Sequence, residues 1–390
     1  MSDSAALRVD VLVLGLGPAG ACAAAAAARA GAHVLAIDRK ARAGLPVQCA
    51  EFVPALIGCE VPDLTRNVRQ AIDAMETFVE DDGADRTDPF PGQMIDRAAF
   101  DASLVEEARR AGAECRLATR AKALASDGTV MLDDGTRLAA RAIVGADGPR
   151  SMAGRAIGRV NRELVETRQV TVPLLAAHRA TDIFLSAAIP GGYGWLFPKG
   201  AVANVGAGVD RAHRGMLKAI VARLHDSLAA EGRVGREVLA LTGGAIPVGG
   251  MLDPRGSLAS CAVLLAGDAA GLANPVTGAG IASAVHSGVL AGAAAARFAA
   301  GDATACDDYA EELDDLFAAA LARAAARRRE LAASSCDKPA LRRSWIAYPE
   351  YWMPETGDRP HFPKSEIPCG DARISSFGKW GLSPVSISRR

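Results

Sequence analysis

Residues 9–38 read VDVLVLGLGPAGACAAAAAARAGAHVLAID, and this stretch decides the fold. Residues 8–14 form a short apolar strand, residues 20–30 an alanine-rich helix, and residues 33–37 a second apolar strand. Because the connections between them are short, we expect the two strands to lie side by side in a parallel sheet. The stretch therefore predicts a Rossmann-like α/β domain.

The turn GLGPAG, residues 15–20, has the spacing of a dinucleotide-binding motif. Gly15 permits the sharp turn after the strand, Gly17 lets the backbone approach a pyrophosphate, and Gly20 lets helix and strand pack closely. The helix N-terminus then offers unpaired N–H groups to a phosphate. Asp38 closes the second strand, where an acid accepts a hydrogen bond from an adenosine ribose. A lone glycine motif can also be an ordinary tight turn, and it does not separate FAD from NAD.

Two later segments favour a flavin. Residues 261–281, CAVLLAGDAAGLANPVTGAGI, read as a strand ending at Asp268, then a turn and a helix start at Gly280. A carboxylate there would lie beside the ribityl chain, and the helix N-terminus would stabilise an anionic reduced flavin. A capping Asp alone would explain Asp268 but not the later glycines. In AIVGADGPRS, residues 142–151, Asp147 follows a buried strand and is expected on the pyrophosphate side of the cofactor.

The composition is that of a soluble α/β enzyme. The 390 residues carry a net charge of −1 and are 50% hydrophobic, and this near-neutral balance argues against nucleic acid as a partner. The acidic start does not resemble an export signal, and the apolar stretches 11–28 and 281–300 are expected to be packed elements rather than membrane spans. Eight cysteines without a CxxC pair indicate reduced thiols and no metal site. We therefore expect a cytoplasmic protein.

Between about residues 160 and 255 the pattern changes to alternating, strand-like runs. We interpret this region as an inserted antiparallel sheet that carries the substrate pocket. The sequence thus predicts a discontinuous FAD-binding domain, a substrate-binding sheet and a C-terminal helix with an aromatic tail. Their boundaries are 1–75, 96–160 and 256–300 for the first, 76–95 and 161–255 for the second, and 301–390 for the third.

The C-terminal part is expected to contain a long helix near residues 307–332, with one apolar face. That face would hold Leu313, Leu316, Phe317, Ala320 and Leu321. The cluster Arg327, Arg328 and Arg329 would be a solvated helix end, favourable to the helix dipole. Disordered tails are poor in aromatic residues, so the tryptophans that follow indicate that at least residues 341–362 pack on something.

Together these motifs resemble the flavoprotein superfamily that contains the aromatic hydroxylases and the geranylgeranyl reductases. Two segments point to the reductase branch. LPVQCAE, residues 45–51, is similar to the family's loop with a cysteine near the flavin, and GGYGWLFPKG, residues 191–200, is similar to its YxWxFP signature. The resemblance covers about residues 8–300, and Phe52 departs from the small glycine expected at its position. It implies FAD contacts at Ala19, Asp38, Cys49, Ala50, Arg97, Ala121, Asp268, Gly280 and Ile281.

The resemblance implies that reduced FAD delivers hydride to a carbon–carbon double bond of a prenyl group, with NAD(P)H or another reductant as electron donor. Tyr193, Trp195 and Phe197 alternate on a strand and therefore face one side. The family assigns them to a prenyl pocket, whereas core packing is the usual explanation for such aromatics. Cys49 is either a thiol that positions or protonates substrate, or a small residue packed under the ring. Arg97 could pair with a phosphate or with a nearby acid.

Two other functions are compatible with the same motifs. The first is an FAD-dependent monooxygenase that hydroxylates an aromatic or amine-bearing substrate. The second is a flavin-binding scaffold without turnover. For the reductase, the expected partner is an apolar small molecule or a prenyl lipid, and a peripheral contact with the inner membrane face is compatible with that substrate. The oligomeric state does not follow from the sequence.

Overall fold

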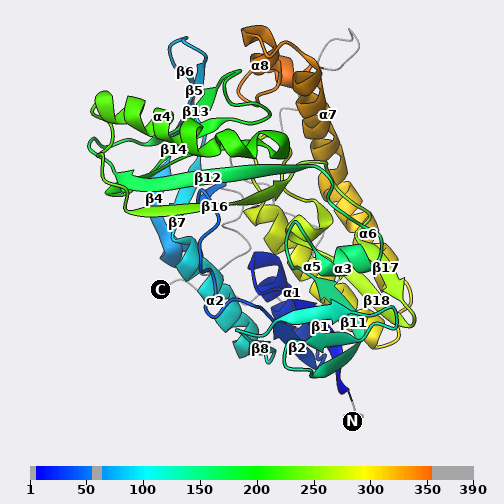
Figure 1. Cartoon of the computed structure of the whole chain (residues 1–390). Helices are drawn as coiled ribbons and strands as arrows, with labels where there is room; N and C mark the ends of the chain where they lie inside the picture. Colours follow the sequence, from blue (N-terminus) through cyan, green and yellow to red (C-terminus); the bar gives the residue numbers. More distant parts are fainter. Residues whose placement is uncertain (1–5, 55–63, 354–390) are drawn as a thin grey trace, which may run out of the picture. The chain divides into compact units, whose positions relative to one another are not determined.

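An eight-stranded sheet carries the N-terminal motif (Figure 1). The computed structural model describes residues 6–54 and 64–353, and the first of its two units ends at Tyr351. The sheet runs in the order β17-β18-β11-β1-β2-β8, with β10 pairing β11 and β9 pairing β10. The strands are β1 (Leu7–Leu14), β2 (Val34–Ile37), β8 (Glu114–Arg116), β9 (Ala121–Leu124), β10 (Val130–Leu132), β11 (Arg137–Gly145), β17 (Arg255–Leu258) and β18 (Cys261–Leu265).

The central strands of this sheet are parallel. β1 pairs in parallel with β2 and with β11, and β11 pairs in parallel with β18. Residues Val11, Leu12 and Val13 of β1 are fully buried, as expected for a central parallel strand. The helix α1 (Pro18–Arg29) joins β1 to β2. The Rossmann-like prediction is therefore confirmed.

The helix α5 (Ile281–Ala299) lies beside α1 (Figure 1). Both helices consist largely of alanine and other small residues, so their backbones can approach closely. By length and composition alone, α5 could cross a membrane, but 56% of its most apolar window is buried within the structure. This burial supports the prediction that residues 281–300 form a packed helix.

The second sheet has seven strands in the order β16-β12-β15-β14-β13-β5-β6. Its strand pairs are antiparallel except β13 with β5. The expected inserted sheet is therefore present, and two strands from the earlier segment assigned to it, β5 and β6, belong to it. The turn η3 (Arg211–Met216) and the helix α4 (Leu217–Ala230) pack against this sheet, and α4 shares an apolar core with β12 and β15. The strands are β5 (Ala74–Val79), β6 (Asp85–Thr87), β12 (Leu164–Pro173), β13 (Ala180–Leu185), β14 (Gly194–Lys199), β15 (Val202–Asp210) and β16 (Ala240–Pro247).

A small third sheet, in the order β3-β7-β4, leads into the helix α2 (Arg97–Arg110). It is formed by β3 (Phe52–Pro54), β4 (Val68–Ile72), which follows the turn η2 (Leu64–Asn67), and β7 (Gly92–Ile95). The segment 76–95, predicted to join the substrate-binding sheet, is divided between two sheets. β5 begins at Ala74 and lies in the seven-stranded sheet, whereas β7 lies in the small sheet. The domain boundaries stay a prediction.

The long C-terminal helix is present, but its apolar face differs from the prediction. α6 (Ala305–Leu313), the π-helical segment η5 (Asp314–Ala318) and α7 (Ala319–Ala333) follow one another directly. Leu313 and Leu321 are buried, whereas Leu316 is 47% exposed. The prediction of a single apolar face from Leu313 to Leu321 is wrong. A π turn adds a residue, which rotates the following positions away from the 3.6-residue period.

In the arginine cluster of α7, Arg329 is exposed as predicted, whereas Arg327 and Arg328 are not solvated. Arg327 is 7% exposed and its Nε donates to the Tyr351 carbonyl at 3.0 Å, while Arg328 forms an ion pair with Asp210. Two short helices follow, α8 (Lys338–Arg343) and α9 (Pro349–Trp352). Trp345 is 3% exposed, so the start of the tail packs as predicted, and the part of that prediction beyond residue 353 lies outside the described residues.

Candidate functional site

The glycine turn between β1 and α1 shapes a backbone cradle. Gly15 has a φ of +99°, and a Cβ at Gly20 would lie 1.8 Å from the Gly15 carbonyl oxygen, so neither position tolerates a side chain. A Cβ at Gly17 would meet nothing within 4 Å. Gly17 is also the N-cap of α1, and no described side chain caps the helix there. The first N–H groups of α1, next to Ala19, are therefore available to an anion.

The carboxylate of Asp38 lies beside this turn. Its Oδ2 accepts the Leu16 N–H at 2.8 Å and its Oδ1 accepts the Lys40 N–H at 2.8 Å. The Thr119 N–H donates to the Asp38 carbonyl at 2.8 Å, which brings the segment leading to Ala121 to the same strand end. A carboxylate has about four lone-pair sites, so Asp38 can still accept a hydrogen bond from a ribose hydroxyl.

The carboxylate of Asp268 lies next to the start of α5. Asp268 belongs to the turn η4 (Gly267–Ala270), and a Cβ at Gly280 would lie 3.4 Å from its Oδ1. Ile281 is the first residue of α5. Burial raises the pKa of Asp268 to about 6, and the positive charge of Arg97 works against this rise. Asp268, Arg97 and the N-terminus of α5 thus lie within electrostatic reach of one another.

The Asp147 side chain accepts hydrogen bonds from the start of the next helix. Its Oδ1 accepts the Ser151 hydroxyl at 2.5 Å and its Oδ2 accepts the Met152 N–H at 2.5 Å, which fixes the N-terminus of the helix α3 (Met152–Ala156). The backbone of Asp147 borders the cradle, since a Cβ at Gly15 would lie 3.1 Å from the Asp147 Cα. A part for Asp147 in cofactor binding stays a prediction.

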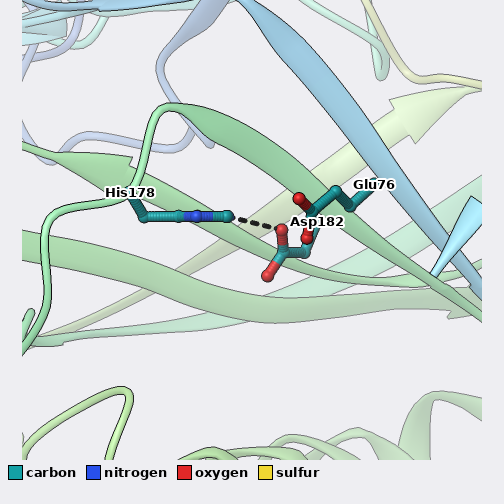
Figure 2. A group of neighbouring side chains, drawn as sticks. All are labelled: Glu76, His178 and Asp182. Atoms are coloured by element: carbon teal, nitrogen blue, oxygen red, sulfur yellow. Dashed lines mark hydrogen bonds and ion pairs between the residues drawn. The ribbon is translucent and has the colours of Figure 1, made fainter. Parts of the chain in front are cut away.

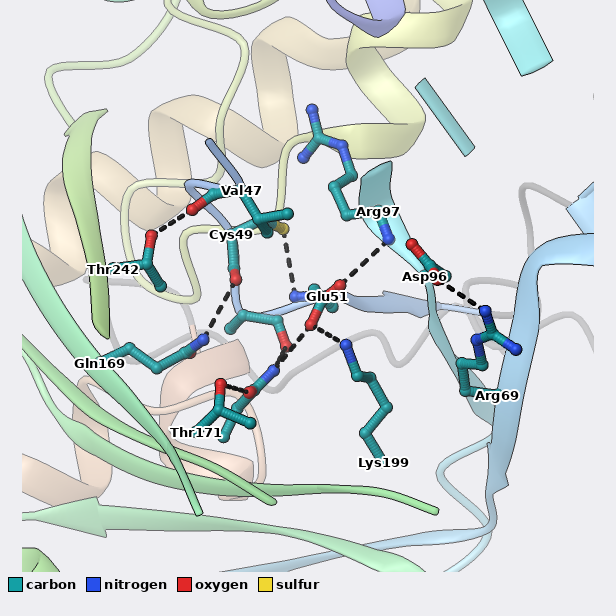
Figure 3. Close-up of polar contacts among 12 residues, drawn as sticks. Val47, Cys49, Glu51, Arg69, Asp96, Arg97, Gln169, Thr171, Lys199 and Thr242 are labelled. Atoms are coloured by element: carbon teal, nitrogen blue, oxygen red, sulfur yellow. Dashed lines mark hydrogen bonds and ion pairs between the residues drawn. The ribbon is translucent and has the colours of Figure 1, made fainter. Parts of the chain in front are cut away.

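The loop of residues 45–51 is held by side chains of the seven-stranded sheet (Figure 3). Gln169 of β12 donates its Nε2 to the Cys49 carbonyl at 3.3 Å. Asn204 of β15 donates its Nδ2 to the Ala50 carbonyl at 3.2 Å. A hydroxyl on β16 holds a third carbonyl of the loop in the same way. The inserted sheet therefore fixes the position of the loop that carries Cys49.

Glu51 ends this loop at the centre of a buried polar network (Figure 3). It is 4% exposed, has a φ of +70°, and its Oε1 accepts the Arg97 N–H at 3.0 Å. Its Oε2 accepts from the Lys199 ammonium and, at 3.0 Å, from the Asn204 amide. No sequence motif predicted the roles of Glu51, Lys199 and Asn204. Glu51 and Lys199 lie inside the two family segments, which is the signal that could have found them.

Cys49 and Arg97 lie close to each other beside this network. The Cys49 Sγ accepts the Glu51 N–H at 3.1 Å. Arg97 begins α2, and its Nε donates to the Asp101 Oδ1 at 2.7 Å. Burial would lower the pKa of Arg97, but Asp101 and Cys49 outweigh burial and hold this pKa above its usual value. Arg97 was expected to pair with a phosphate or with a nearby acid, and the structure shows that Asp101 is such an acid.

Tyr193, Trp195 and Phe197 form an aromatic row on one face of the seven-stranded sheet. Neighbouring ring centroids are 5.7 and 6.2 Å apart, so the expectation that the three rings share a face is confirmed. Trp195 and Phe197 are each 6% exposed. Phe52, which stands where the family has a small residue, packs its ring 5.9 Å from Phe197. Phe52 therefore extends the aromatic row.

The C-terminal segment covers the aromatic row. The Trp345 ring lies 4.8 Å from that of Tyr193, and Leu341 and Tyr348 belong to the same apolar cluster. The Tyr193 hydroxyl donates to the Thr277 carbonyl at 2.5 Å, in the turn before α5. Burial, together with Cys49, raises the pKa of Tyr193. The row thus contacts segments next to the predicted flavin site, and this burial is compatible with core packing and with pocket lining.

A second polar cluster consists of Glu76, His178 and Asp182 (Figure 2). Each can offer one ligand atom, and these atoms lie within 4.8 Å of one another. His178 Nε2 is 2.6 Å from Asp182 Oδ1, and the other Asp182 oxygen pairs with Arg233. Glu76 pairs with Arg86 at 3.0 Å. Because both carboxylates already have a cationic partner, we interpret the cluster as an ion-pair network of the sheet.

The residues brought together around the cradle fit a bound FAD. The open space at Gly17, the uncapped N-terminus of α1 and the strand-end carboxylate of Asp38 suit the pyrophosphate and the adenosine ribose. Asp268 and the start of α5 suit the ribityl chain and the flavin ring. The two parts adjoin each other, since a Cβ at Gly267, next to Asp268, would lie 3.1 Å from the Ala19 Cβ.

Family models match both halves of this arrangement. The model described as a geranylgeranyl reductase catalytic domain matches residues 165–246, which include the aromatic row. The model described as a lycopene cyclase protein matches residues 10–164, which include the glycine turn and the loop of residues 45–51.

Two curated relatives carry the same name. The digeranylgeranylglycerophospholipid reductase 2 of Methanosphaera stadtmanae is 33% identical over 321 residues, which span 75% of this chain and 78% of that protein. The digeranylgeranylglycerophospholipid reductase of Methanocaldococcus jannaschii is 29% identical over 324 residues, which span 78% of this chain and 79% of that protein.

Solved structures share the fold. A geranylgeranyl bacteriochlorophyll reductase-like protein from Thermoplasma acidophilum matches with a TM-score of 0.76 and 24% identity, covering 86% of this chain and 90% of that one. A structure from Pseudomonas aeruginosa, described as a probable FAD-dependent monooxygenase, matches with a TM-score of 0.65 and 20% identity over 86% of this chain and 98% of that one. The FAD-binding fold predicted from the sequence is therefore confirmed.

Proposed function

We propose, because this chain belongs to the geranylgeranyl reductase family of FAD-dependent oxidoreductases, that it reduces carbon–carbon double bonds of a prenyl group. The observation that carries the proposal is the aromatic row, a buried apolar cluster that adjoins the loop of Cys49. Ala50, Phe52 and Val276 belong to the same apolar cluster as the row. A flexible hydrocarbon chain needs such an extended apolar wall, and the wall also excludes water from the reacting bond.

The chain's own residues would hold the cofactor as follows. The N–H groups at the start of α1 bind the pyrophosphate, Asp38 accepts from the ribose and Asp268 accepts from the ribityl chain. Arg97 keeps a positive charge beside Cys49 and Asp268. Bound FAD supplies hydride when it is reduced, with NAD(P)H or another reductant as the source of electrons. Cys49 or a water molecule supplies the proton.

The two large sheets suggest separate binding regions for the cofactor and the substrate. On this proposal the segments 1–75, 96–160 and 256–300 bind FAD, and the segments 76–95 and 161–255 bind the prenyl group. The cysteines that the structure describes are free thiols, which supports a reducing compartment such as the cytoplasm. A prenyl-lipid substrate would bring the protein into contact with a membrane surface.

The reductase function is tested directly in an anaerobic reaction. Enzyme reduced with dithionite should be reoxidised by a geranylgeranyl compound, with one double bond saturated for each flavin reoxidised, as measured by absorbance at the flavin band and mass spectrometry of the product. If the reduced enzyme passes electrons to no alkene, but consumes oxygen in proportion to an aromatic substrate, the monooxygenase takes the place of the reductase. A protein that turns over neither would be the flavin-binding scaffold.

Replacing Asp268 with alanine should weaken FAD binding at least tenfold, because a charge-assisted hydrogen bond contributes about 1.5–3 kcal/mol. The stability of the apoprotein should not fall. Burial raises the pKa of Asp268 to about 6, so the ionised carboxylate costs stability in the folded apoprotein above that pH, and the apoprotein variant should melt no lower than wild type at pH 7. Asp315→Ala, on the exposed surface of η5, is the control. Equal FAD affinity in the two variants would remove Asp268 from the site.

A further inference from the structure

Residues 338–348 close off the aromatic row, and this segment is called the cover below. It consists of α8 and the residues that follow it up to Tyr348. Its side chains Leu341 and Trp345 are 2% and 3% exposed, and they belong to the same apolar cluster as the row. Trp195 of the row is itself almost inaccessible. A prenyl chain that contacts the row must therefore displace part of the cover.

The indole N–H of Trp345 is buried and has no hydrogen-bond partner among the described residues. The rings of the row differ in this respect. The Tyr193 hydroxyl donates to the Thr277 carbonyl, and Trp195 Nε1 donates to Gln169 Oε1. A buried donor without a partner destabilises the conformation that contains it. The closed position of Trp345 thus carries a cost that water would remove if the indole moved outward.

Polar contacts at the surface hold the outer side of the cover to the hairpin of β5 and β6. The Lys338 ammonium pairs with Asp82 at 2.6 Å, and the Arg342 guanidinium pairs with the same carboxylate at 2.9 Å. The Tyr348 hydroxyl donates to the Asp85 Oδ2 at 2.7 Å. The side chains of the two cations are 37% and 31% exposed, so water and salt screen these pairs. They fix the closed position but cost little to break.

The chain changes direction where α7 ends and the cover begins. Ser334 ends α7 in an extended conformation. Cys336 has a φ of +54°, a left-handed conformation that is uncommon for cysteine and that often marks segments that move. α8 has only six residues, and so short a helix is marginal once it leaves its packing partners. Its backbone hydrogen bonds should therefore open when the cover leaves the sheet.

We propose that Trp345 controls the access of the prenyl chain to the aromatic row. The cover opens about residues 334–336, and the chain takes the place of the indole against the Tyr193 ring, which lies 4.8 Å from it. This inference rests on the proposed prenyl reductase function. Because the chain binds only when the cover is open, its apparent affinity is proportional to the open fraction. A change that favours the open cover should therefore tighten binding by the same factor.

The test compares two double variants with the same loss of charge. Lys338→Gln with Arg342→Gln removes the two cations that hold the cover. Arg110→Gln with Arg255→Gln breaks ion pairs on α2 and β17 instead and is the control. Two quantities are measured on the oxidised holoenzyme. Calorimetry gives the Kd for geranylgeraniol, and hydrogen–deuterium exchange with mass spectrometry reports the opening of residues 338–348.

In the variant of the cover, amide exchange should rise at least about threefold, because each exposed ion pair contributes little. The Kd for geranylgeraniol should fall by the same factor, because both quantities follow the open fraction. The control should behave as wild type. Faster exchange with an unchanged or higher Kd overturns the proposal, and so does exchange that stays at the wild-type rate.

Replacing Trp345 with alanine gives an independent test, because the two roles of the indole predict opposite changes. If the chain takes the place of the indole, Trp345→Ala should bind geranylgeraniol about tenfold more tightly, since the closed cover loses its main apolar contact. A fixed pocket wall predicts weaker binding, and a core residue predicts a lower melting temperature with an unchanged Kd. Either result overturns the role of Trp345.

Anaerobic reoxidation keeps this proposal apart from the reductase function. If wild type binds geranylgeraniol, and its Kd and the exchange of the cover change together as described, but reduced enzyme passes no electrons to the alkene, then the reductase function fails and the cover stands. If wild type reduces another prenyl compound but binds no geranylgeraniol, or binds it with no link to the exchange of the cover, the reductase function stands and the cover is not its entrance.

Discussion

Replacing Glu51 with alanine should lower the free energy of unfolding by about 3–5 kcal/mol, because it leaves the Lys199 ammonium without its buried counter-charge. The Glu51 side chain is 6% exposed and that of Lys199 is 20% exposed. The Arg97 N–H and the Asn204 amide lose an acceptor at the same time, and unsatisfied buried donors add to the cost. The loop of residues 45–51 should loosen, and FAD should dissociate more readily. Urea unfolding and flavin fluorescence measure the two effects.

Two further variants make this prediction specific. Glu107 pairs with Arg29 and Arg110, whose side chains are 56% and 57% exposed. Glu107→Ala should therefore cost less than about 1 kcal/mol. Glu51→Gln keeps an acceptor for the Arg97 N–H but not the charge that Lys199 needs, so its stability should fall between wild type and Glu51→Ala. If Glu51→Ala unfolds at the same urea concentration as Glu107→Ala, the network does not hold the loop.

The parts of the site that follow from the sequence are those made within one short segment. The turn at Gly15 to Gly20 and the strand-end position of Asp38 follow from local spacing. Backbone groups next to the motif create them, and the structure shows the expected cradle with the Leu16 N–H bound to Asp38. The aromatic row follows in the same way, because alternation along a strand puts Tyr193, Trp195 and Phe197 on one face.

Most of the parts that the sequence did not predict depend on distant segments, and the others on local backbone irregularities. Lys199 meets Glu51 across 148 residues, and the positive φ of Glu51 is not visible in the residue type. The burial of Arg327 depends on a carbonyl 24 residues later. The π turn in η5 breaks the period on which the helical face was based. Likewise, no pattern indicated that Trp345 would cover the aromatic row.

Replacing Trp195 with alanine should lower the free energy of unfolding by about 3–5 kcal/mol and also impair substrate use. Trp195 is 6% exposed, and its Nε1 donates to the Gln169 Oε1 at 2.9 Å. Gln169 in turn donates to the Cys49 carbonyl, so the indole supports the flavin loop as well as the apolar surface. Trp195→Phe keeps an aromatic ring but removes the N–H. That variant should keep more stability than Trp195→Ala while it loses the hydrogen bond to Gln169.

A matched truncation on the other face separates a core role from a pocket role. Phe184 stacks on Phe78 at 5.0 Å and packs in the α4 core, away from the cluster that contains Trp195. Phe184→Ala should lower the melting temperature without a selective effect on turnover. For Trp195→Ala, flavin-monitored melting is compared with anaerobic flavin reoxidation by a geranylgeranyl substrate, measured well below the melting temperature. A pocket role predicts a raised KM in Trp195→Ala alone. If Trp195→Ala melts early, sheds FAD and then turns over substrate no worse per bound flavin than Phe184→Ala, the row is core and the prenyl group binds elsewhere.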